Sequence, residues 1–116
     1  MKKALPLLLL LAAPALAGPR LFISFVGLPP GLAAPACAGA AKSSLDPSFS
    51  NARIQNGNGH AFNERFSVIV YCDLDVHQAY IIVGGNESST TLPDVQSLKD
   101  QLKTRLIQLI PGARPL

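Results

Sequence analysis

Three potential metal ligands occupy every second position between two apolar segments. If this segment were an extended strand, Asp73, Asp75 and His77 would point to one face, because side chains alternate along a strand. Two carboxylates and an imidazole could hold a divalent metal such as zinc with one position open, as in a metal-binding protein or a small metal-dependent hydrolase. The alternative is a hairpin turn, since Asp is a common turn residue. We favour the turn and keep the metal site as a second hypothesis.

The chain contains two cysteines, Cys37 and Cys72. In an exported protein an even number of cysteines indicates a disulfide. A bridge between them would close a loop of about 36 residues and stabilise the domain by roughly 3–4 kcal/mol. A reactive Cys72 beside His77 is the alternative, but no Cys-x-x-Cys spacing is present to lower the pKa of a thiol. We therefore predict a structural disulfide.

A group of candidate contact residues lies in a segment rich in glycine and asparagine. Asn56, Asn58 and His60 are separated by single glycines, and this composition is typical of turns because Asn and Gly tolerate positive φ angles. A dinucleotide-binding loop would need a third glycine where Phe62 stands, with a helix after it. We predict that these three side chains contact a partner and that no cofactor is needed, apart from the metal of the second hypothesis.

The N-terminal residues 1–17 have the pattern of a secretory signal. Lys2 and Lys3 precede an apolar stretch, and Ala15-Leu16-Ala17 supplies the small residues that a signal peptidase requires. The apolar stretch is shorter than the roughly 20 residues of a membrane-spanning helix. We predict cleavage after Ala17 and a secreted or periplasmic single domain over residues 18–116, without a membrane span.

Composition excludes several classes of protein. A chain of 116 residues is long enough for one domain and too short for a multi-domain enzyme. With 48% hydrophobic and 15% charged residues it is neither a coiled coil nor a charge-rich disordered chain. The net charge of +3 falls to +1 once Lys2 and Lys3 leave with the signal. No cluster of Lys and Arg then remains to indicate a nucleic-acid partner.

Several apolar segments have the length of strands. Residues 21–26 and 79–83 are rich in β-branched and aromatic residues. Residues 62–72 alternate, with Phe66, Val68, Val70 and Cys72 on one face and Ser67, Ile69 and Tyr71 on the other. Because both faces are largely apolar, we expect this strand inside the sheet, antiparallel to residues 79–83. Residues 53–55 could add a short edge strand.

Residues 92–109 predict an amphipathic helix. Its apolar residues recur every three or four positions, at Leu92, Val95, Leu98, Leu102, Leu106 and Leu109. Thr91 is the expected N-cap, and Pro111-Gly112 ends the helix. Ile107 lies about 100° from Leu106 around the helix, so we expect it to pack at the sheet edge or to contact a partner.

These elements predict an α+β domain. A mostly antiparallel sheet of three to four strands would be covered on one face by the C-terminal amphipathic helix. Residues 28–60, rich in Pro, Gly, Ala and Ser, are expected to be mostly irregular, and loops of that length are usually functional or disordered. We predict a small exported, disulfide-stabilised binding or interaction module without catalysis. Its partner would be a protein or another cell-envelope component, and a homo-oligomeric structural component is a third possibility.

Overall fold

The computed structural model describes residues 20–116, so the predicted signal at residues 1–17 lies outside the described residues. The described part forms six strands and two helices. Their order is β1 (Arg20–Gly27), α1 (Ala34–Leu45), β2 (Arg53–Gln55), β3 (Asn58–Phe62), β4 (Phe66–Asp73), β5 (Gln78–Gly85), α2 (Leu92–Leu109) and β6 (Arg114–Pro115). The domain is α+β as predicted, with more strands than the expected three to four.

One antiparallel sheet contains all six strands, in the order β2-β3-β4-β5-β1-β6. β4 and β5 form the predicted hairpin, in which Ile69 lies opposite Ile82. β1 lies on the other side of β5 and places Ile23 opposite the same Ile82. The short β2 is at the edge, as residues 53–55 predicted.

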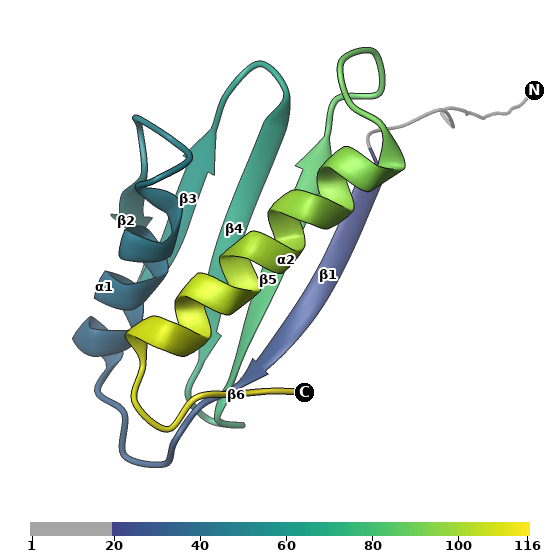
Figure 1. The fold of residues 1–116 in the computed structure, drawn as a ribbon. Coiled ribbons are helices and arrows are strands. Elements are labelled where there is room, and N and C mark those ends of the chain that lie inside the picture. The colour runs from purple at the N-terminus through teal and green to yellow at the C-terminus, as the bar shows by residue number, and fades with distance from the viewer. Residues whose placement is uncertain (1–19) are drawn as a thin grey trace, which may run out of the picture.

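Both helices lie on the same face of the sheet (Figure 1). α1 packs over β3 and β4, whereas α2 crosses β5 and β1 and also touches α1. The core between the helices and the sheet includes Leu45, Val70, Ile81 and Leu102, each of which is fully buried. Neither helix in residues 20–116 is long and apolar enough to cross a membrane.

The predicted C-terminal helix is confirmed together with its cap. The Thr91 hydroxyl accepts a hydrogen bond from the Asp94 amide at 3.3 Å, and the Asp94 carboxylate accepts one from the Thr91 amide at 2.9 Å. This reciprocal pair satisfies two amide groups that the first helical turn leaves free. After the helix, Gly112 has a φ of +87° and turns the chain back toward β6.

The apolar stripe of α2 is buried only in its middle. Val95, Leu98, Leu102 and Leu106 are buried, while Leu92 and Leu109 are exposed. The two exposed leucines stand at the helix ends, beyond the packed middle of the helix, and Ile110 just after the helix is buried instead. Ile107 is partly buried and packs against the core.

The prediction that residues 28–60 are mostly irregular is wrong, since this region contains α1, β2 and β3. Alanine is the best helix former, and Pro35 lies at the first positions of α1, where proline is tolerated. The alanines and the position of Pro35 are therefore compatible with a helix. Gly59 of β3 lets α1 approach closely, because a Cβ there would lie 2.9 Å from backbone and side-chain atoms of Ala41.

The predicted single strand over residues 62–72 is also divided. β3 ends at Phe62, and the Asn63 side chain accepts hydrogen bonds from the amides of Arg65 and Phe66, each at 2.8 Å. Such an Asx turn reverses the chain. As a result β3 folds back along β4, and His60 lies opposite Ile69.

The Cys37–Cys72 disulfide is present. It joins α1 to the end of β4 and so fixes the helix on the sheet. Cys37 is fully buried and Cys72 partly so. The predicted structural bridge is therefore confirmed.

Candidate binding surface

The sheet has one face that α1 and α2 leave uncovered, which we call the open face (Figure 1). Its side chains alternate along each strand with the buried core residues, and the register of the sheet aligns them in rows across the strands. The apolar members are Leu21, Ile23 and Phe25 of β1, Tyr80 and Ile82 of β5, Ile69 and Tyr71 of β4, and Phe62 of β3.

Large apolar side chains on the open face are exposed. The exposed fractions are 61% for Leu21, 49% for Ile23, 45% for Phe25, 42% for Tyr71 and 53% for Phe62. The uncovered face of an antiparallel sheet is ordinarily polar, because alternation puts apolar residues inside and polar residues outside. A contiguous apolar face of this kind marks an interaction site more often than an isolated exposed residue does.

Aromatic rings form a row across three strands of the open face. Phe25 meets Tyr80 edge to face at a centroid distance of 5.4 Å, and Tyr80 stacks on Tyr71 at 5.8 Å. Such pairs stabilise the sheet by roughly 0.5–1.5 kcal/mol each beyond area burial. The row therefore joins three strands of the open face through contacts between aromatic rings.

Tyr80 is the middle ring of the row, and its hydroxyl donates a hydrogen bond to Asp73 at 3.4 Å. Partial desolvation and then the negative charge of Asp73 raise the pKa of the Tyr80 phenol above its ordinary value. Tyr80 thus stays neutral across the physiological range. Among the open-face residues of β1, β5 and β4, the charged one is Asp73, which lies at the end of the sheet. The centre of the face is uncharged.

The other end of the open face is hollowed to a volume of about 810 Å³. The hollow forms at Gly84, which contributes no side chain between Leu21 of β1 and Ser67 of β4. Leu21, Ile69 and Ile82 project beside it. Its rim is polar and comes from the turn before β4 and the loop after β5, which are joined where the Asn86 amide donates to the Arg65 carbonyl at 2.8 Å.

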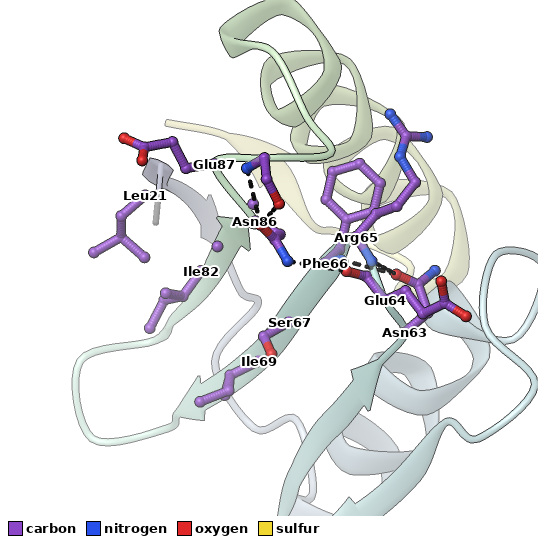
Figure 2. Close-up of a pocket in the computed structure, with 13 residues that line it drawn as sticks. Leu21, Asn63, Glu64, Arg65, Phe66, Ser67, Ile69, Ile82, Asn86 and Glu87 are labelled. Atoms are coloured by element: carbon purple, nitrogen blue, oxygen red, sulfur yellow. Dashed lines mark hydrogen bonds between the residues drawn. The ribbon is translucent and has the colours of Figure 1, made fainter. Parts of the chain in front are cut away.

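Arg65 is directed away from this hollow (Figure 2). Its guanidinium donates to the Asp94 carboxylate at 3.0 Å and to the Ser89 carbonyl at 3.1 Å. The cation is thus paired with the start of α2. The floor of the hollow is apolar, and an anionic ligand would find the nearby positive charge already neutralised.

The predicted metal ligands lie at the β4–β5 turn. β4 ends at Asp73, and pairing resumes with β5 at Gln78, so the chain reverses between them. His77 adopts a left-handed conformation with a φ of +55°, which is incompatible with a strand carrying all three side chains on one face. Within residues 20–116, no three His, Cys, Asp or Glu side chains are grouped so as to hold a metal ion.

The predicted partner-contact residues are dispersed. Asn56 and Gly57 form the β2–β3 turn with positive φ angles, as the composition indicated. The Asn58 side chain accepts a hydrogen bond from the Cys72 amide at 2.9 Å and so braces β3 against β4. His60 is half-buried on the open face, whereas Ile107 lies on the helix side of the sheet. Partner contact by these residues stays a prediction.

The apolar residues of the open face were not among the contact residues that we predicted from the sequence. The signal was present, because residues 62–72 have apolar side chains at both alternating sets of positions. We took that pattern to place the strand inside the sheet, but it is equally typical of a strand covered on both faces, and the described chain supplies helices for one face (Figure 1). Comparisons with protein-family models, curated proteins and solved structures gave no match.

Proposed function

We propose that this protein is a small exported binding module without catalysis, and that its open face docks onto an apolar surface of a protein partner in the cell envelope. The observation that carries the proposal is the uncovered apolar face with its row of aromatic rings. Export is inferred from the N-terminal pattern and fits with the Cys37–Cys72 disulfide.

The chemistry of the open face favours a protein over other ligands. A small molecule requires a concave site that encloses most of its surface, whereas the hollow occupies one end of the open face. A nucleic acid requires clustered cations, and the centre of this face is uncharged. Apolar surface that is rich in aromatic side chains and poor in charge is characteristic of the cores of protein–protein interfaces.

The size of the face is adequate for a specific complex. Three strands of eight residues, each about 26 Å long, and the five-residue β3, about 17 Å long, lie about 4.8 Å apart and give roughly 450 Å². A standard interface uses about 800 Å² on each partner. The polar rim, which includes His60 and Gln78, supplies the remainder, so the apolar part would be the desolvated centre of the interface.

Site-specific photo-crosslinking in the protein's own host tests this proposal. A photoreactive side chain replaces Tyr71 on the open face in one variant and Leu109 on α2 in the other. The two positions have similar exposure, 42% and 45%. We expect a discrete adduct from Tyr71 alone. The crosslinked partner peptide should be apolar, and Ile69→Lys should abolish the adduct.

Three outcomes would overturn the proposal. Equal adducts from Tyr71 and Leu109 would indicate random encounters, and no adduct from either would leave the face without a partner. An adduct only at twice the mass of the chain would replace the partner by a second copy on the same face.

A further inference from the structure

The outer edge of β1 is mostly unpaired. In the strand order, β6 is the neighbour of β1 on that side, and it pairs only with Val26 and Gly27. Within residues 20–116, the backbone from Leu21 to Phe25 therefore has no strand on its outer side. Every second residue of that stretch directs its N–H and C=O groups outward, as in any antiparallel edge.

This edge also lacks the features that prevent strand addition. Exposed edges are normally blunted by charged residues, prolines, bulges or short length. The Leu21–Phe25 stretch contains no charged residue and no proline. The opposite edge of the sheet is formed by β2, which has three residues and begins with Arg53.

We infer that a second copy of this chain pairs its β1 with this edge in antiparallel orientation, with the two-fold axis at Ile23. The free stretch sets the centre, because Ile23 is its middle residue. This register pairs Leu21 with Phe25 of the other copy and Ile23 with its own counterpart. All of these side chains then continue the open face, as directly opposed antiparallel residues share a face.

The helix-side face of β1 is complementary in the same register. Phe22 would lie opposite Ser24 of the other copy, so each large ring is matched with a small side chain on both sides of the axis. Phe22 is partly buried against the core, and Ser24 is 8% exposed. A shift of one residue would place helix-side residues opposite open-face residues. An axis at Phe22 would set two Phe22 rings against each other and leave Phe25 unpaired.

The self-complementary sequence around Ile23 favours a second copy over an unrelated strand. The paired stretch is short, about 17 Å for five residues. It buries less than the roughly 1,200–2,000 Å² of a standard interface, so the dimer should be reversible and should dissociate on dilution. This inference concerns the edge and does not depend on what the open face binds.

Cysteine crosslinking of the oxidised protein tests the register. Directly opposed residues have Cα atoms about 4.5–5.5 Å apart, which is within disulfide range. Ile23→Cys should therefore form a covalent dimer with itself. Leu21→Cys and Phe25→Cys should not self-link, because each lies about 13 Å from its own copy along the strand, but a mixture of these two variants should form a mixed dimer.

Leu109→Cys on α2 is the control for random collision, since it is exposed to a similar degree as Phe25. Sedimentation of the unmodified chain should show a dimer at high concentration that Ile23→Lys abolishes. The inference is wrong if Ile23→Cys stays monomeric, if all the cysteine variants self-link at the same rate, or if the unmodified chain sediments as a monomer at every concentration. None of these results bears on photo-crosslinking from Tyr71.

Discussion

Two adjacent glycines at the end of β5 should respond in opposite ways to the same substitution. Gly84 is on the open face and Gly85 is on the helix side, since neighbouring residues of a strand point to opposite faces. Neither has a positive φ angle, so alanine fits the backbone at both. A Cβ on Gly85 would lie 2.4 Å from Val95 Cγ2 and 2.6 Å from Thr90 Oγ1, whereas one on Gly84 meets nothing closer than 3.8 Å.

The loss of stability in Gly85→Ala depends on whether Val95 and Thr90 can move away from the new methyl group. Val95 is fully buried in α2, where a β-branched side chain has essentially one rotamer. The Thr90 hydroxyl donates a hydrogen bond to the Asn86 carbonyl at 2.6 Å. Overpacking at such a site costs about 1–3 kcal/mol, and the lower entropy of the unfolded alanine chain offsets about 0.4–1 kcal/mol. Gly85→Ala should therefore lose about 1–2 kcal/mol, while Gly84→Ala should gain up to about 1 kcal/mol.

Thermal unfolding of the oxidised protein measures both variants. For a domain of this size, 1 kcal/mol corresponds to about 4–8 °C in Tm. We expect Gly85→Ala to unfold about 4–16 °C below the unmodified protein and Gly84→Ala to unfold at the same temperature or a few degrees above it. Equal shifts for the two variants, or a larger loss at Gly84, would mean that the faces of β5 are assigned wrongly. The open face would then have no basis.

The remaining predictions concern other parts of the fold. Replacing both Cys37 and Cys72 by Ala should lower the free energy of unfolding in urea by roughly 3 kcal/mol, and an unchanged midpoint would contradict a bridge that constrains the unfolded chain. Thr91→Ala should cost about 1 kcal/mol. Hydrogen bonds from Thr91 lower the pKa of the Asp94 carboxyl, so the stabilisation by Asp94 is complete above its unfolded pKa of about 3.9 and is lost as pH falls through the lower folded value. The difference between Asp94→Asn and the unmodified protein should therefore shrink from pH 6 to pH 2. His77→Gly should unfold at an equal or higher temperature, because glycine adopts the left-handed conformation freely, and protein purified without chelators should hold no stoichiometric zinc; zinc that His77→Ala removes would restore the metal site.

Local sequence features predicted the elements that depend on local chemistry. Thr91 and Asp94 specify the start of α2 by hydrogen bonds within one turn, and an Asn-Gly pair specifies the turn between β2 and β3. α1 illustrates the opposite case. Its N-cap residue makes no side-chain hydrogen bond, so its Pro-, Gly- and Ala-rich sequence offered no capping signal and favoured a loop.

The division between β3 and β4 was missed for a similar reason. Asn63 is the single turn residue that provides the acceptor for two amides, and it is flanked by residues that also suit a strand. Once the turn is placed there, β3 pairs with β4 as a separate strand. One of the two additional strands therefore depended on an Asx turn that periodicity does not detect, and the other is the two-residue β6, which pairs with the end of β1.

The apolar second face of the strands links the sequence to both proposals. The double-sided apolar pattern of β4 indicated two covering layers, and the described chain supplies one of them (Figure 1). Pairing of two β1 edges would not supply the other, because antiparallel addition extends a face and does not cover it. It would join two open faces into one surface of roughly 900 Å², larger than the largest apolar patch of a typical monomer. A dimer formed through β1 would therefore present a larger exposed apolar surface for a partner to cover, whereas in a monomer that surface would stay the size of one open face.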